Sequence, residues 1–331
     1  MARGTLSLAC TISCLLGFTP AFAEWSAVAE NKVSYTDDVF QFSAARRLSL
    51  SEDPSQPTVV PLDKPQDVIV EPSLEVFRSS DSRWGKTELS AKAAGFLYTE
   101  HPIFDHGNYR LQLKQTFAPD TSALLRYRYV PNLFLGPNFS RRFSPSSRQE
   151  ERVTSHTWRI QIERQVTDAW TLTLVARYGL RLYNEVFAQR DTHFWTVGPQ
   201  VAFHAASWAT LTLAYLYERG LADGRDQPQF RDDVSYRQHF LSFSGDLRLA
   251  EPLSLKLSYV FRPVEFTSDL AGDPNRGRED VTHQGLGELR YQLTEKLTVT
   301  AGFQRTQRTS TASASGFFDD IVSFGAQYRF N

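Results

Sequence analysis

Arginine and lysine recur at alternate positions of apolar segments in this 331-residue sequence. In one such segment Arg110, Gln112 and Lys114 alternate with Leu111 and Leu113. A guanidinium group can bind a carboxylate or a phosphate through two parallel hydrogen bonds, so arginines that share one cavity would favour anions there. The residues predicted to line such a cavity, among which cations outnumber acids, are Arg110, Lys114, Arg126, Arg128, Arg159, Glu163, Arg177, Arg181, Glu218, Asp246, Arg248, Lys256, Arg262, Glu288, Arg290 and Arg329.

Seven histidines are the other candidates for chemistry. His101 and His106 share a short polar segment with Asp105, and this set of donors could hold a metal ion. Loop histidines at this density are usually just solvated, and we favour that interpretation over a metal site. No serine stands in a Gly-x-Ser-x-Gly or His-x-Ser pattern, and the sequence contains no glycine-rich phosphate loop. We therefore predict no catalytic residue, no metal and no cofactor, and we rank a hydrolase last among the candidate functions.

The segments that carry the arginines have the two-residue period of β-strands. Trp170, Leu172 and Leu174, for example, lie on one face of their segment. Charged side chains cannot face hydrocarbon cheaply, so the charged faces should line a lumen while the apolar faces contact lipid. We predict an all-β fold with strands near 37–50, 67–78, 86–99, 107–117, 122–131, 153–165, 169–184, 192–206, 207–219, 235–249, 252–263, 281–293, 296–308 and 319–330.

The connections between these segments alternate between short and long. Short ones such as 166–168 and 250–251 follow and precede longer polar ones such as 132–152 and 220–234. Short turns on one side of the membrane and long loops on the other are typical of transmembrane barrels, whereas a soluble β-sandwich has no reason to sort its loops in this way. The sequence therefore predicts a transmembrane antiparallel β-barrel over residues 37–331, with an even number of strands, most simply fourteen.

The N-terminal part of the predicted barrel is its least regular part. Pro72 interrupts the second predicted strand, so a twelve-stranded barrel is the alternative, with residues 37–85 as a plug or a tail. Residues 24–36 are predicted to be a periplasmic lead-in. The arginine-rich connection 132–152 is long enough to fold inward as a constriction, and it could equally contact lipopolysaccharide phosphates.

Residues 1–23 have the features of a secretory signal peptide. Arg3 precedes an apolar run over 6–18, and the segment ends in Ala21-Phe22-Ala23. Cleavage after Ala23 would remove both cysteines, so the mature chain would contain no disulfide. The formal net charge of −1 gives no argument for nucleic-acid binding. Together with the predicted barrel, these features indicate the bacterial outer membrane.

Both ends of the predicted barrel resemble known bacterial patterns. Near its start, the run 35–40, Tyr-Thr-Asp-Asp-Val-Phe, and the proline-bearing segment 68–74 are similar to the β-barrel porin-2 group. That resemblance implies an outer-membrane barrel, in some members associated with exopolysaccharide export. The last strand resembles the β-signal that outer-membrane proteins present to the barrel assembly machinery, through Ser323, Gly325, Tyr328 and Phe330.

These observations favour a porin-like channel for passive permeation of small polar or anionic solutes. One alternative is a barrel component of exopolysaccharide export, and another is a closed structural barrel in which the arginines pair with acids. The expected partners are outer-membrane lipid and lipopolysaccharide, the barrel assembly machinery and the solutes, with no nucleic acid. Export would need a ladder of inward aromatic rings, for which the candidates are Phe77, Phe96, Tyr98, Tyr183, Phe194 and Phe240.

Overall fold

The protein is a closed barrel of fourteen antiparallel strands, in which each strand pairs with its sequence neighbours and β1 closes onto β14. The computed structural model describes residues 24–40, 66–312 and 316–330. The predicted fold class and strand number are confirmed, and the twelve-stranded alternative is wrong. The strands are β1 (Glu24–Thr36), β2 (Asp67–Ser82), β3 (Gly85–Tyr98), β4 (His106–Ala118), β5 (Thr121–Ser140), β6 (Ser144–Thr167), β7 (Trp170–Tyr183), β8 (Thr192–Ala206), β9 (Ala209–Ala222), β10 (Tyr236–Ala250), β11 (Leu253–Phe266), β12 (Glu279–Gln292), β13 (Leu297–Ser310) and β14 (Phe317–Phe330).

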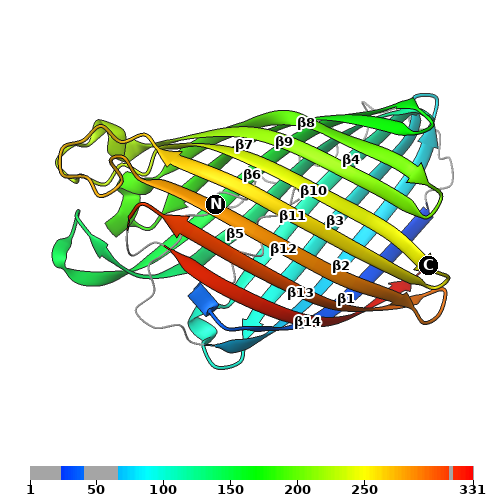
Figure 1. The fold of residues 1–331 in the computed structure, drawn as a ribbon, viewed down its shortest axis with the longest axis horizontal. Helices are drawn as coiled ribbons and strands as arrows, with labels where there is room; N and C mark the ends of the chain where they lie inside the picture. The colour runs from blue at the N-terminus through cyan, green and yellow to red at the C-terminus, as the bar shows by residue number, and fades with distance from the viewer. Residues whose placement is uncertain (1–23, 41–65, 313–315, 331) are drawn as a thin grey trace, which may run out of the picture.

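The two ends of the barrel differ in their connections, as the sequence predicts. Tight turns such as 168–169 and 251–252 lie at the right-hand end in Figure 1, where β14 also ends. The longer connections gather at the other end and contain the short 3-10 helices η1 (Pro102–Phe104), η2 (Glu185–Arg190) and η3 (Asp223–Asp226). No helix within the described ranges is long and apolar enough to cross a membrane.

The first strand does not lie where the sequence analysis places it. Residues 24–36 form β1, which pairs with β2 on one side and with β14 on the other, so the predicted lead-in is wrong. The predicted strand 37–50 is also wrong at its start, because Asp37 and Asp38 leave the wall, and its remainder lies outside the described residues. Ala29 and Asn31 occupy lipid-facing positions of β1, and they weaken the apolar alternation that would have revealed it.

Pro72 lies inside β2 and does not end it. Its partner in β1 is Asn31, and the ladder to β3 pairs Val70 with Leu97 and resumes at Ser73 and Ala94. Proline has no backbone N–H, so the two unpaired positions between these pairs are where its absence is accommodated. Residues 67–85 therefore belong to the wall and not to a plug, while the possible plug region 41–65 lies outside the described residues.

The connection predicted over 132–152 is mostly strand. β5 runs to Ser140 and β6 starts at Ser144, so the two strands extend beyond the barrel rim as one hairpin. The pairing shifts near Leu133 and again near Gly136. Such bulges place extra residues in one strand and erase the two-residue period that sequence analysis relies on. The hairpin base is apolar, since buried Leu133 and Val153 pack with Phe187 of η2.

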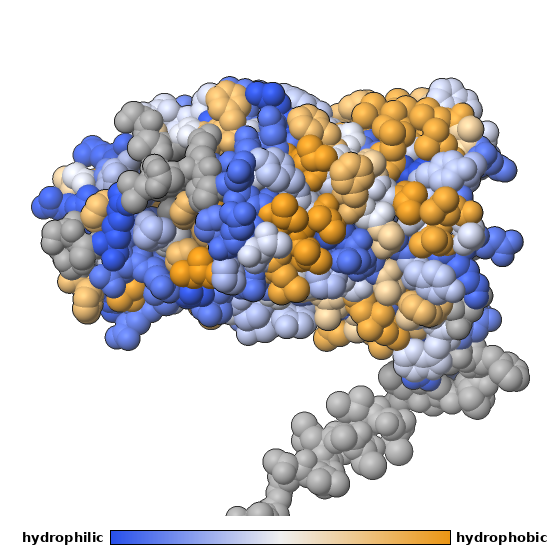
Figure 2. All heavy atoms as spheres, turned by 90° about the horizontal axis from the view of Figure 1, so that it is seen from below, coloured by the Kyte–Doolittle hydropathy of each residue, from blue (hydrophilic) through white to orange (hydrophobic). Residues whose placement is uncertain are grey.

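The outer surface has the apolar band expected of a lipid-facing barrel. Large apolar side chains such as Leu111, Ile160 and Leu174 are each more than half exposed. Figure 2 shows apolar side chains gathered over the middle and right of one face, whereas the end that carries the long connections is mainly hydrophilic. Near the tight turns Trp170 stacks on Phe203 with ring centroids 4.5 Å apart. An aromatic pair at the edge of an apolar band is typical of a membrane interface.

Candidate functional site in the barrel lumen

The residues predicted to line a cavity lie on strand positions that alternate with the exposed apolar side chains. Their exposure varies along the barrel. Those with buried side chains are Arg128, Arg159, Arg177, Arg181, Glu218 and Arg262. Those with intermediate exposure are Arg110, Lys114, Arg126, Glu163, Lys256 and Glu288. Asp246, Arg248, Arg290 and Arg329 are exposed.

The exposure of these side chains changes along each strand, from one end of the barrel to the other. Along the inner face of β10, Tyr236 and Phe240 are buried near the long connections, while Asp246 and Arg248 are exposed near the tight turns. β14 shows the same trend, from buried Phe317 to exposed Arg329. The interior is therefore packed with side chains in the half that adjoins the long connections and is open to water, as a vestibule, in the half that adjoins the tight turns.

Three arginines stand side by side in the packed half. Arg126 of β5 is the register partner of Arg159 of β6, and Arg159 is the partner of Arg177 of β7. Directly paired residues on one face of a sheet have Cβ atoms about 5 Å apart, so this row concentrates positive charge on one wall. The row ends at an amide on one side, where Arg126 Nε and Nη2 donate to Gln112 Oε1 at 2.9 and 2.7 Å.

On the other side the row ends at the carboxylate of Glu218. Glu218 is 1% exposed, and its Oε1 accepts a 2.6 Å hydrogen bond from the Tyr236 hydroxyl. Arg181 Nη2 lies 3.7 Å from the same oxygen, and Arg177 Nη2 lies 4.0 Å from Oε2. This one carboxylate therefore offsets part of the charge of two buried arginines.

Two glycines make room for aromatic rings on this inner wall. A side chain at Gly179 would meet the Phe194 ring at 2.1 Å, and one at Gly220 would meet the Tyr236 ring at 2.2 Å. Each ring lies over the glycine that is its own register partner. Arg181 lies over the Phe194 ring, with 4.1 Å from Cζ to the centroid. The sequence analysis missed these pairs, which only the strand register brings together.

The opposite wall carries acids that the sequence analysis also missed. A cavity of about 150 Å³ is lined by side chains of β1 to β5 that include Glu30, Lys32, Glu71, Lys92 and Arg110. Arg110 Nη2 lies 2.6 Å from Glu75 Oε1, and Lys32 Nζ lies 3.4 Å from Glu288 Oε2. Glu30 lies in the segment predicted to be a lead-in, and Glu71 and Glu75 lie in the region predicted as a possible plug, so none of the three was predicted to line the lumen. The lumen consequently contains more acidic side chains, relative to its basic ones, than the predicted residues alone indicate.

A basic hollow of about 310 Å³ lies in the vestibule near the tight turns. It brings together four of the predicted residues, Asp246, Arg248, Lys256 and Arg290. Arg290 Nε donates to Glu288 Oε1 at 2.8 Å. Within the described part of the chain, Arg248 and Lys256 form no hydrogen bond or ion pair through their charged groups. The hollow therefore presents cations that water, or a solute, must solvate.

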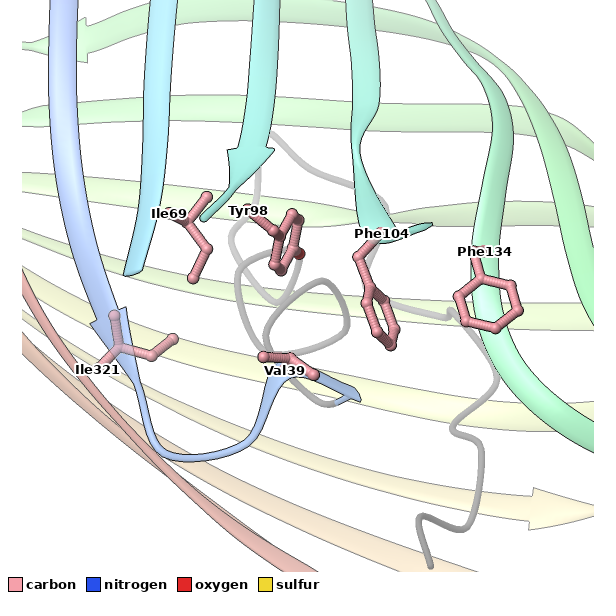
Figure 3. Close-up of a cluster of buried hydrophobic side chains, with 6 residues drawn as sticks. All are labelled: Val39, Ile69, Tyr98, Phe104, Phe134 and Ile321. Carbon is pink, nitrogen blue, oxygen red and sulfur yellow. The ribbon is translucent and has the colours of Figure 1, made fainter. Parts of the chain in front are cut away.

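An apolar cluster closes the rim near β2 and β3. Val39, Ile69, Tyr98, Phe104, Phe134 and Ile321 are all buried there. Figure 3 shows these side chains gathered around one point although they come from segments far apart in the sequence. Phe40 adds an edge-on contact to Phe104, with ring centroids 5.2 Å apart. The chain that follows β1 therefore turns inward at residues 39 and 40.

The two histidines considered for metal binding have structural partners. His101 Nδ1 lies 2.9 Å from Asp67 Oδ2, and the same carboxylate accepts hydrogen bonds from the backbone of Thr99 and Glu100. His106 Nδ1 lies 2.8 Å from the Phe104 carbonyl oxygen, and its ring stacks on Phe96. Across the described ranges, no cluster of three or more His, Cys, Asp and Glu side chains could hold a metal ion.

Charged side chains join the long connections to one another. Arg190 Nη1 lies 2.8 Å from Glu151 Oε1, and Arg190 Nε lies 2.8 Å from Asp232 Oδ2. In the same region, burial raises the pKa of Asp191 and, together with nearby Asp273, that of Asp233. These ion pairs therefore hold the connections together as a cap over the packed half of the barrel.

The inward aromatic residues do not form a continuous track. Tyr98 lies in the rim cluster, Tyr183 lies in the cluster at the base of the β5–β6 hairpin, and Phe240 packs with Val175, Leu216 and Val260. All three rings are buried. A polysaccharide would need exposed rings at regular intervals, so this arrangement gives export no support.

Comparison with solved structures gives outer-membrane proteins. The outer membrane channel DcaP of Acinetobacter baumannii matches with a TM-score of 0.54 and 9% identity over 93% of this chain and 97% of that chain. A loop L8 deletion mutant of OmpT, an outer membrane protein of Vibrio cholerae, matches with a TM-score of 0.50 and 10% identity over 93% and 99%. This chain has the outer-membrane β-barrel fold. At such low identity the likeness concerns the fold alone, and no family model and no curated protein matches the sequence.

Proposed function

We propose that the protein is a porin-like channel of the bacterial outer membrane that passes small polar and anionic solutes. The basic hollow carries this proposal, because its cations stand at the water-filled entrance of the lumen. Within the described chain the charged groups of Arg248 and Lys256 form no ion pair, although Asp246 is the register partner of Lys256, so together they would lower the free energy of an anion that enters.

The next cations along this route are the paired arginines. The row of Arg126, Arg159 and Arg177 would receive the anion from the vestibule, and guanidinium groups can replace its hydration shell with hydrogen bonds. The acids on the opposite wall attract cations, so the arginines would exclude cations only in part. We therefore propose a preference for anions and not their exclusive passage.

Charge removal in the hollow tests the proposal. The double variant R248Q/K256Q should shift the reversal potential under a salt gradient toward cation preference, since both side chains lie in the vestibule. The matched control is R164Q, which removes a cation from an exposed position, 70% accessible and beside Asp120, on the outer face of β6. An equal shift in both variants, or no shift in the double variant, would refute a role for the hollow in selectivity.

The proposal also covers location and assembly. Ser323, Gly325, Tyr328 and Phe330 lie in β14, and the rings of Tyr328 and Phe330 contact each other edge-on with centroids 4.8 Å apart. Both rings are more than 40% exposed, so they are accessible to the assembly machinery and later to lipid. We propose that the tight turns, the start of β1 and the end of β14 face the periplasm. We expect the signal peptide to be cleaved after Ala23.

A further inference from the structure

Four tyrosine–histidine pairs recur on the outside of the barrel. In each pair the tyrosine hydroxyl lies within hydrogen-bonding distance of histidine Nδ1, at 2.7 to 2.9 Å. The two members come from the two strands of one hairpin, and the pairs occupy four successive hairpins from β5 to β12. They are Tyr127–His156, Tyr178–His193, Tyr215–His239 and Tyr259–His283. We call these eight residues the Tyr–His belt.

The belt follows a single rule of register. In every hairpin the histidine is the Cα partner of the residue two positions after the tyrosine, so His156 faces Tyr129 and His239 faces Tyr217. The same offset holds for His193 with Leu180 and for His283 with Phe261. The four repeats of this offset extend over eight of the fourteen strands, from β5 to β12. This internal repeat was not detected in the sequence analysis.

The belt lies outside, near the end that carries the long connections. Tyr178, Tyr215 and Tyr259 are each more than 40% exposed. Trp158 borders the belt, with its ring centroid 6.2 Å from that of His156. Trp195 lies 5.5 Å from Tyr217, whose ring is 5.4 Å from that of His239. Tyrosine and tryptophan at one height on the lipid-facing surface mark the boundary between hydrocarbon and headgroups.

The pairing leaves each imidazole with one free nitrogen. When the tyrosine hydroxyl donates to Nδ1, the neutral ring carries its proton on Nε2 and can donate it to another group. When the ring is protonated, both nitrogens donate and the tyrosine hydroxyl is released as a further donor. In either state the pair offers donors to an acceptor at headgroup level, and protonation adds a positive charge.

Two arginines lie directly beyond the belt. Trp195, Arg219 and Arg237 are consecutive register partners on β8, β9 and β10, and Arg237 is two residues before His239. Arg237 forms two 2.7 Å hydrogen bonds to Glu265, whereas Arg219 forms none within the described chain. Near His283 the outward charges are Glu279 and Arg305, and Arg305 lies 3.6 Å from Asp320. Arg219 is therefore the uncompensated cation beside the belt.

We propose that the Tyr–His belt and Arg219 bind the phosphate groups of anionic lipid in the outer leaflet. This inference rests on the proposed membrane location but not on channel activity. Histidine donors, released tyrosine hydroxyls and a guanidinium at one height match an array of phosphates in a lipid surface. Among the described residues of β14 and β1 the motif does not occur, and there Tyr35 OH donates to Gln66 Oε1. Anionic lipid should therefore concentrate against β5–β12.

Tryptophan quenching by brominated lipid tests the proposal on the refolded chain. The variant W25F/W84F/W170F/W208F keeps Trp158 and Trp195 as reporters beside the belt. The matched reporter W25F/W84F/W158F/W195F keeps Trp170 and Trp208 near the tight turns. Both are inserted into phosphatidylcholine vesicles that contain equal fractions of brominated phosphatidylglycerol or brominated phosphatidylcholine. The measured quantity is the ratio of quenching by the anionic lipid to quenching by the zwitterionic lipid.

The belt reporter should give a ratio above one that rises about twofold between pH 8 and pH 5, because a protonated imidazole adds a positive charge and a donor at headgroup level. The reporter near the tight turns should show no such rise. Adding H156Q, H193Q, H239Q and H283Q to the belt reporter should abolish the pH dependence. Adding R219Q should instead lower the ratio at every pH.

Heat-shifted migration in gels would establish that each variant is folded before it is compared. If the fourfold histidine variant does not fold, H239Q alone should reduce the rise, since the register partner of His239, Tyr217, is two residues from Arg219. A belt ratio that does not change with pH, equal ratios at both ends of the barrel, or a rise that survives in the folded histidine variant would overturn the proposal.

Discussion

At the scale of single residues, the inner wall depends on small side chains as much as on charged ones. Gly220 lets the Tyr236 ring lie flat against the wall, where its hydroxyl donates to Glu218 and accepts a 2.9 Å hydrogen bond from Arg181. The ring therefore connects the packing of the wall to the charge of the arginine row.

Replacing Gly220 by alanine should destabilise the barrel by about 1–3 kcal/mol, because the added methyl group must displace the Tyr236 ring from a packed interior. Urea unfolding of the refolded variant, followed by tryptophan fluorescence, would give this value. Gly285 in β12 is the matched control, since nothing lies within 4 Å of a side chain added there. Equal stability of G220A and G285A would contradict the account of the wall.

Alternation in the sequence places a residue on one face of a strand but does not name its neighbours. Arg159 and Arg177 could be placed on the charged face from sequence alone. That they are direct partners, and that Glu218 completes the network, follows from the register between strands, which turns and bulges determine. Glu71 and Glu75 were not predicted to line the lumen, because the irregular strand that holds them was a candidate for a plug.

At the scale of elements, the connections form a cap whose stability should depend on pH. Burial raises the pKa of Asp191, which accepts a 2.6 Å hydrogen bond from the backbone N–H of Tyr183. A carboxyl group with a raised pKa favours the folded state fully below its ordinary pKa of about 4, and this contribution is lost as the pH rises through the folded-state value. Asp233 has the same sign.

Hydrogen exchange should therefore show stronger protection of the connections 184–191 and 223–235 near pH 4 than near pH 7, after correction for intrinsic rates. The variant D191N/D233N should lose this difference, since asparagine keeps an oxygen that can accept the backbone hydrogen bonds. Protection that rises with pH, or a difference that persists in the variant, would show that other groups control the cap.

Regular strands could be predicted from sequence because their lipid-facing side is apolar without interruption, as in β7 and β11. β1 and the outer parts of β5 and β6 could not. In β1 small and polar residues occupy lipid-facing positions, and in the β5–β6 hairpin bulges near Leu133 and Gly136 break the period. The Tyr–His belt was not predicted because the two members of each pair are 15 to 29 residues apart and meet only across a hairpin.

At the scale of the whole molecule, the order of short and long connections was the most informative feature of the sequence. This order of connections depends on the closure of the barrel and not on any single strand. It therefore predicted a barrel correctly although β1 was predicted in the wrong place. The asymmetry also divides the lumen, with a capped and packed half beneath the long connections and a basic vestibule at the other end. The proposed selective permeation rests on the vestibule.

The reversal potential of the refolded, unmodified chain in a planar bilayer under a salt gradient tests this account most directly. We predict stable single-channel openings and a reversal potential of the sign set by anion preference, because the cations of the vestibule and the arginine row would face the proposed conducting path. A cation-selective reversal potential would contradict the assigned role of these residues. A demonstrably folded barrel that shows no openings would contradict the channel itself.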